Sequence, residues 1–213
     1  MRSPTVMALV SVLAVIAMAS WTCVIEQSDS MSAFISDFVV DGVQYDHAES
    51  EGEVEIVGLR NDFEDTFFNI PETVTYLDVD YTVVGIKASA LYGESELTSV
   101  TIPSTVTAIG YNAFKNCSGL TGIEIPDSVT SIGYDAFYGC TGLKSLTLGS
   151  GVTELPAGCF HGCTGLTSVT IPDSIIAIDG SFEGCRNITE LDLGSVERLE
   201  GNAFAYLTRL TSV

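Results

Sequence analysis

Basic side chains are scarce in this 213-residue chain, which has 8 Lys and Arg residues against 28 Asp and Glu residues and a net charge of −20. Binding to nucleic-acid phosphates requires clusters of Lys and Arg, so the composition excludes a nucleic-acid partner. The acidic stretches also lack the oxygen spacing and central glycine of a calcium loop. We therefore expect no bound metal and interpret the acidity as a source of solubility.

Histidine is almost absent, since the chain contains only His47 and His161. Neither residue lies beside a serine or cysteine in a nucleophile motif, and the repeated part of the chain contains no paired acids with a catalytic spacing. We predict that the protein is not an enzyme and uses no cofactor.

Long apolar runs are also lacking, apart from one over residues 6–18. Arg2 precedes this run, and Ala17-Met18-Ala19 follows as a small-x-small cleavage site, which predicts a signal peptide over residues 1–19. The run is shorter than the roughly 20 residues that cross a bilayer, although an uncleaved anchor stays an alternative. Cys23 is a poor site for a lipid anchor because no small residue directly precedes it. We expect a secreted or cell-surface protein that contacts the membrane only through the signal peptide or an uncleaved anchor.

The rest of the chain repeats itself every 22 or 23 residues. A degenerate copy covers residues 74–96, and the chain ends at Val213, four residues into a further copy. The clear copies, three of 23 residues and then two of 22, begin at Leu97, Leu120, Leu143, Leu166 and Ile188. Such a period is typical of a solenoid.

Each copy opens with apolar residues at its first, fourth and sixth positions, as in Leu97, Val100 and Ile102. This spacing predicts a strand, followed by a glycine-containing turn and a short helical or 3-10 segment. One copy has too few apolar side chains to fold alone, whereas stacked copies bury both faces of each coil and pair their strands in parallel. We predict a repeat solenoid with a parallel β-sheet on one face and short helical turns opposite.

The repeated pattern L-T-S-V-T-I-P-x-S-V-T-x-I-G-x-x-A-F-x-x-C-x-G resembles the BspA-like class of leucine-rich repeats, found on exported surface proteins of microbes. The resemblance covers residues 74–213. It implies a leucine-rich repeat solenoid of about six coils in a secreted or cell-surface protein that binds other molecules and is sometimes adhesive. It does not name a ligand.

Two segments precede the repeats. Residues 20–33 form a short serine-rich linker. Residues 34–73 resemble the β-rich lead-in of such proteins and predict an N-terminal cap built on a hairpin of residues 37–45 against 52–58. We expect this cap to cover the first coil and to block pairing at its edge.

The stretch AGCFHGCTG at residues 157–165 places Cys159, His161 and Cys163 close together. In other copies the Cys163 position holds cysteine or Leu207, which indicates an apolar packing position. The Cys159 position otherwise holds Ala or Ser and is expected to face inward, whereas the His161 position varies and is expected to be exposed. A zinc site is disfavoured because His161 would have to turn to the face of both thiols. Disulfides between cysteines of neighbouring coils stay an alternative.

Two N-x-S/T sequons occur, at Asn116 and Asn187. Both asparagines occupy positions that hold glycine in other copies, so we expect both to serve left-handed turns. Glycosylation of either residue is the alternative.

The outward strand positions are where a binding function would lie. We predict a binding face formed by Thr98, Ser99, Thr101, Thr121, Glu124, Lys144, Ser145, Thr147, Thr167, Ser168, Thr170, Glu190 and Asp192. Small hydroxyl residues dominate and aromatic anchors are scarce, so weak multivalent contact with a protein or glycan ligand at the cell surface is expected. The alternative is a structural spacer that presents another domain or partner.

Overall fold

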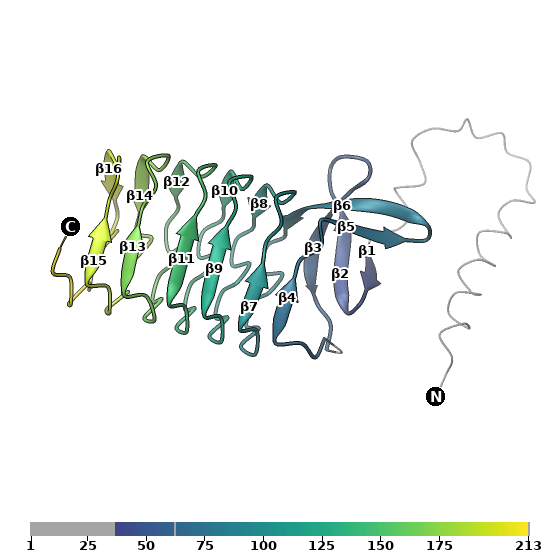
Figure 1. Cartoon of the computed structure of the whole chain (residues 1–213), viewed down its shortest axis with the longest axis horizontal. Helices are drawn as coiled ribbons and strands as arrows, with labels where there is room; N and C mark the ends of the chain where they lie inside the picture. The colour runs from purple at the N-terminus through teal and green to yellow at the C-terminus, as the bar shows by residue number, and fades with distance from the viewer. Residues whose placement is uncertain (1–36, 62, 213) are drawn as a thin grey trace, which may run out of the picture. The chain divides into compact units, whose positions relative to one another are not determined.

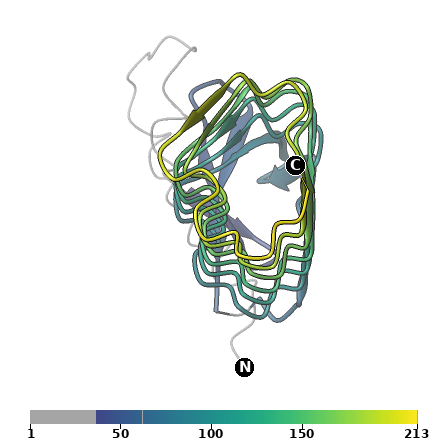
Figure 2. The ribbon, with the colours of Figure 1, turned by 90° about the vertical axis from the view of Figure 1, so that its left-hand side faces the viewer.

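The computed structural model describes residues 37–61 and 63–212. The predicted signal peptide and linker, together with Cys23, lie outside the described residues. Within residues 37–61 and 63–212 the chain forms sixteen strands and no helix. Successive coils stack along one axis and superimpose when viewed along it (Figure 2).

One parallel ladder, here the first ladder, takes the opening strand of each coil (Figure 1). Its strands are β4 (Phe67–Asn69), β7 (Ser99–Thr101), β9 (Gly122–Ile125), β11 (Ser145–Leu148), β13 (Ser168–Thr170) and β15 (Glu190–Asp192). Alternate side chains of each strand point inward, as predicted from the spacing. Pairing is continuous from β4 to β11 and resumes from β13 to β15, with a break between β11 and β13.

The second ladder lies across the core and takes the short strand after each coil's first turn. Its strands are β6 (Val79–Ile86), β8 (Ala108–Ile109), β10 (Ser131–Ile132), β12 (Glu154–Leu155), β14 (Ala177–Asp179) and β16 (Arg198–Glu200). Pairing is interrupted between β10 and β12. The two breaks flank the coil that begins at Leu143.

The core contains a column of phenylalanine rings, one for each coil. Phe137 lies parallel to Phe114 at 4.8 Å between ring centroids and to Phe160 at 5.2 Å. Phe182 and Phe204 continue the column at 5.4 and 6.0 Å. Each such contact adds about 0.5–1.5 kcal/mol beyond burial, so the column holds neighbouring coils in register.

The expected helical segment of each coil is instead a series of turns. The N–H groups of Phe114 and Asn116 donate to the next coil, at Ala136 O and Tyr138 O, both at 2.7 Å. Only the intervening residue donates backward within its own turn, from Lys115 N to Asn112 O at 3.0 Å. Because alternate donors pair with the neighbouring coil, and because Asn112 and Asn116 have φ of 57° and 63°, a helix cannot form there.

The N-terminal strands are β1 (Asp37–Val40), β2 (Val43–His47), β3 (Glu53–Leu59) and β5 (Thr73–Tyr76). The segment 37–45, expected as one strand, turns back at Asp41 and Gly42, whose φ values are 49° and 78°. An Asp-Gly pair with positive φ is the preferred two-residue hairpin turn. β2 then pairs antiparallel with β3, and β3 pairs in parallel with β6.

These N-terminal strands extend the second ladder only. The sheet order β1-β2-β3-β6-β8-β10 continues that ladder without a gap, and Lys87 Nζ lies 2.6 Å from Asp46 Oδ2 across it. β4, in contrast, is the terminal strand of the first ladder. The expected blocking of edge pairing is therefore wrong for the first ladder, because the N-terminal strands turn onto the other one.

The first ladder begins before residue 74, where the repeats were expected to start. Phe68 pairs with Val100 in register, and Ile70-Pro71-Glu72-Thr73-Val74 matches Ile102-Pro103-Ser104-Thr105-Val106. After Val74 this coil is interrupted by the β5–β6 hairpin, whose second strand, β6, enters the second ladder. The division into a cap and a solenoid stays a prediction, and the structure places one coil strand within the range assigned to the cap.

Candidate functional site

The predicted binding residues all lie exposed along the first ladder, in the row that we call the ladder face. Inward partners such as Val100, Ile123 and Val169 are buried, so strand alternation turns the polar residues outward. Parallel pairing places Thr147 beside Glu124 and Thr170 beside Asp192.

Some hydroxyls on the ladder face serve the fold itself. Thr98 Oγ1 donates to Thr66 O at 2.9 Å, and Thr121 Oγ1 donates to Thr98 O at 3.0 Å. These two side chains tie adjacent coils together. The serines and threonines two residues apart on the strands, such as Ser145 and Thr147, are therefore better placed to contact a ligand.

The ladder face also carries an aromatic residue that sequence reasoning missed. Phe67 is 63% exposed and lies opposite Ser99 in the parallel register, so it stands at the first position of the same row. Aromatic side chains commonly anchor protein interfaces. The match between Ile70–Val74 and Ile102–Val106 is the signal that could have identified Phe67, because it sets the register of this coil.

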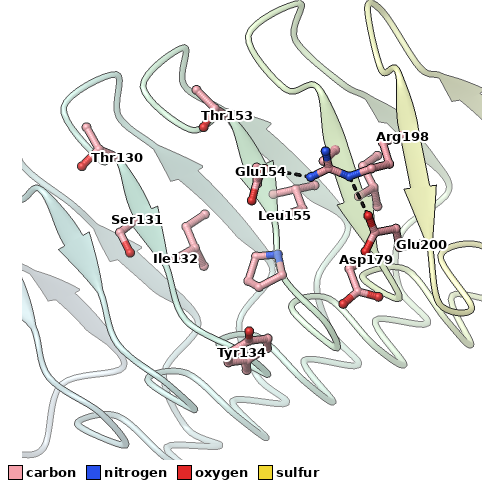
Figure 3. Close-up of a pocket in the computed structure, with 13 residues that line it drawn as sticks. Thr130, Ser131, Ile132, Tyr134, Thr153, Glu154, Leu155, Asp179, Arg198 and Glu200 are labelled. Carbon is pink, nitrogen blue, oxygen red and sulfur yellow. Dashed lines mark hydrogen bonds and ion pairs between the residues drawn. The ribbon is translucent and has the colours of Figure 1, made fainter.

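A second feature is a groove of about 400 Å³ on the second ladder, over the break between β10 and β12 (Figure 3). Thr130 and Ile132 line one side, Glu154 and Pro156 the other, and Tyr134 lies at one end. Asp179, Arg198 and Glu200 extend the groove across β14 and β16.

Pro156 explains why the ladder opens at this groove. It occupies the position of Gly110 and Gly133, whose N–H groups donate to Ile86 O and Ile109 O at 2.8 Å. Proline has no N–H, so the equivalent bond to Ile132 cannot form. A side chain at this position is also crowded, since a Cβ on Gly133 would lie 2.4 Å from Tyr111 N.

Arg198 organises the charges of the groove. Its Nη2 lies 3.0 Å from Glu154 Oε1 and its Nε lies 2.6 Å from Glu200 Oε1, which links three neighbouring coils. All three side chains are more than half exposed, so each pair contributes at most about 1 kcal/mol to stability. The guanidinium, the carboxylates and the exposed ring of Tyr134 could contact a polar ligand, although no motif in the sequence marked them.

The cysteines form a buried column. The thiols of Cys117, Cys140 and Cys163 donate to backbone oxygens of the preceding coil at 2.9, 3.1 and 3.2 Å. Burial raises the pKa of Cys117 to about 12, and burial is also the main cause that raises the pKa of Cys159. A thiol with a raised pKa is a poor nucleophile. All five cysteines among the described residues are free thiols, and the inward packing predicted for Cys159 and Cys163 agrees with their complete burial.

His161 is half-buried rather than exposed as expected. Its ring stacks on Tyr138 with the centroids 4.6 Å apart and 3° between the planes, and its Nδ1 lies 4.0 Å from Glu183 Oε2. The ring therefore packs along the outside of the coils, while Cys159 and Cys163 point into the core. In residues 37–61 and 63–212 no three His, Cys, Asp or Glu side chains are grouped to hold a metal ion.

The two sequons differ in structure. Asn116 is exposed with φ of 63°, close to the 72° of Gly139 at the same position, as expected for a left-handed turn. The same expectation is wrong for Asn187, which does not have positive φ. Glycine occurs at the Asn187 position for space instead, because a Cβ on Gly142 would lie 2.3 Å from Ser118 O. Asn187 donates its amide to Thr164 O at 2.8 Å.

No helix in the described part of the chain is long and apolar enough to cross a membrane.

The family described as BspA type leucine rich repeat region matches residues 84–211 in six copies. No curated protein matches the chain. Similar solved structures include a leucine rich cell surface protein of Faecalibacterium prausnitzii, with a TM-score of 0.68 and 26% identity over 83% of this chain and 54% of that one. This chain thus spans about half the length of that protein.

Two further structures show the same fold. The leucine rich repeat protein of T. pallidum has a TM-score of 0.67 and 24% identity over 82% of this chain and 91% of that one. A leucine-rich repeat protein of Eubacterium ventriosum has a TM-score of 0.68 and 24% identity over 84% of this chain and 51% of that one.

Proposed function

The chain belongs to the BspA type leucine-rich repeat family, and on this premise we propose that it is a non-catalytic, secreted or cell-surface protein that binds a protein or glycan ligand. One observation carries the proposal: successive coils present an unbroken row of exposed polar side chains at fixed spacing along the first ladder. A ligand that spans several coils would gain many weak contacts at once. The predicted signal peptide at residues 1–19 supports the location, as does the cell-surface protein of F. prausnitzii.

The chemistry of the described residues supports a binding role over catalysis. The cysteines are buried with raised pKa values, and His161 stacks on Tyr138 away from any thiol. The exposed polar residues are mostly hydroxyls and carboxylates, which suit hydrogen bonds to a ligand. The high net negative charge would steer basic ligands toward the protein.

The test compares two sets of charge-introducing variants. Purified protein is assayed against a glycan array and a panel of extracellular-matrix proteins. We expect binding to be lost when Ser99→Lys, Ser145→Lys and Ser168→Lys are combined on the ladder face. The matched control combines Ser95→Lys, Ser118→Lys and Thr141→Lys, three exposed turn residues that also lie 23 residues apart, and it should bind as the unaltered protein does.

Unchanged binding by the ladder-face variant would show that this face is not the site. In that case the groove around Arg198 is the next surface to test, by Arg198→Ala and Tyr134→Ala. An absence of binding to every ligand would favour the alternative role, a structural spacer.

A further inference from the structure

The first ladder has an open edge at β4. β4 pairs with β7 on one side, and no strand of residues 37–61 or 63–212 pairs with its other side. The N-terminal strands that could have covered this edge continue the second ladder instead. An uncovered strand edge offers a row of backbone donors and acceptors to an additional strand.

The register identifies the backbone groups that face outward. Thr98 N donates to Thr66 O at 2.6 Å, and Ile70 N donates to Thr101 O at 3.1 Å, so residues 66 and 70 point toward β7. In a parallel strand the bonding direction alternates along the chain. Phe67 and Asn69 therefore direct their N–H and C=O groups away from β7, toward the open edge.

A notch of about 520 Å³ lies at this edge. Apolar side chains from separate segments line it, among them Val43, Phe63 and Val74. Phe63 is fixed there by an edge-on contact with buried Phe68, with 5.5 Å between ring centroids. A strand added to β4 would thus find a preformed apolar pocket for one of its inward side chains.

The charges at the notch have one sign. Asp41 and Asp65 line it, and no Lys or Arg does. Glu64 and Glu72 are exposed at neighbouring positions in the sequence. An incoming segment with Lys or Arg beside its apolar residues would complement this rim, and one with acidic residues would be repelled.

We propose that the β4 edge and its notch bind an extended segment of a partner protein that adds a strand to the first ladder, with alternating apolar residues and flanking Lys or Arg. Its backbone pairs with Phe67 and Asn69, an apolar side chain enters the notch, and the exposed Phe67 ring covers the added strand. This interaction goes beyond the proposed ladder face, because its specificity lies in backbone pairing at one end of the sheet.

The test uses a fluorescent heptapeptide in which three valines alternate with two threonines between terminal lysines. Binding to the purified protein is followed by fluorescence anisotropy. We expect saturable binding that weakens as salt rises. Two control peptides should not bind: one with glutamates in place of the lysines, and one N-methylated at its three central residues, which removes donors from both of its edges.

Matched variants locate the peptide on the protein. Asn69→Pro removes an outward N–H and should weaken binding about fivefold, the effect of one net hydrogen bond, whereas Asn69→Ala keeps that N–H and should stay within about twofold. Phe67→Ala should weaken binding to a similar or greater extent, whereas Leu199→Ala, at an exposed apolar residue of β16, should not. Because the N-methylated peptide tests pairing on unaltered protein, a loss of folding in Asn69→Pro would leave the test intact.

Several results would overturn the proposal. These are no binding of the valine peptide, equal binding of the N-methylated or glutamate peptide, or equal effects of Asn69→Pro and Asn69→Ala. Binding that occurs only after residues 20–36 are removed would identify that segment as the occupant. Dimers in sedimentation that Phe67→Ala dissociates would identify a second copy instead. None of these outcomes bears on the ladder face, whose test relies on Ser99, Ser145 and Ser168.

Discussion

The Cys163 thiol donates a hydrogen bond to the Phe137 carbonyl oxygen of the preceding coil, at 3.2 Å. Cys140 and Cys185 make the same contact one coil before and one coil after, to Phe114 O and Phe160 O. The cysteine position therefore does two things: it fills apolar space and it satisfies a buried backbone acceptor. A leucine, as at Leu207, can do only the first.

This column predicts a loss of stability in alkali. The folded pKa of Cys117 is raised to about 12 from an ordinary value of 9.0, so above pH 9 the unfolded chain releases a proton that the folded chain keeps. The stabilisation is complete below pH 9 and is lost as the pH rises toward 12. Urea unfolding in reducing buffer at pH 7.5, 9 and 10 should show a falling free energy of unfolding, with a smaller fall in Cys117→Val. An equal fall in both proteins would contradict the assignment to Cys117.

The phenylalanine column predicts a large cost for a cavity. Phe137 contacts a parallel ring on each side and is fully buried, so Phe137→Ala should lower the free energy of unfolding by about 3–5 kcal/mol. Tyr134→Ala, at a 60% exposed position, should change it by less than about 0.5 kcal/mol. Urea denaturation followed by circular dichroism compares the two. Similar losses would mean that the column does not hold the coils together.

Two glycine positions should respond differently to substitution. A Cβ on Gly133 would meet backbone atoms of the preceding coil at 2.4 Å, so Gly133→Ala should cost about 1–3 kcal/mol. Gly162 has φ of 69° and no atom within 4 Å of a Cβ, and Asn116 occupies the same position with φ of 63°. Gly162→Asn should therefore stay within about 0.5 kcal/mol of the unaltered protein. Equal thermal midpoints for the two variants would refute this difference.

The repeat, the buried cysteines and the outward polar row could be predicted from the sequence because each position recurs in several copies. The β4 coil could not be placed in this way, since the β5–β6 hairpin interrupts it and hides the register of Phe67. The groove at Arg198 depends on which strands separate when Pro156 replaces a glycine. His161 varies among copies as an exposed residue would, yet a stack on Tyr138 depends only on the ring that the previous coil supplies.

Pro156 provides a test of how the groove arises. Pro156→Gly restores an N–H at the position where Gly110 and Gly133 donate across the second ladder, and it removes the side chain that keeps β12 away from β10. We expect the amide introduced at position 156 to exchange slowly with solvent, with Ile132 O as its acceptor. Thermal stability should change little, because the gain of about 1 kcal/mol from the new hydrogen bond is offset by the backbone entropy of glycine. Fast exchange at that amide would show that the ladder stays open for a reason other than Pro156.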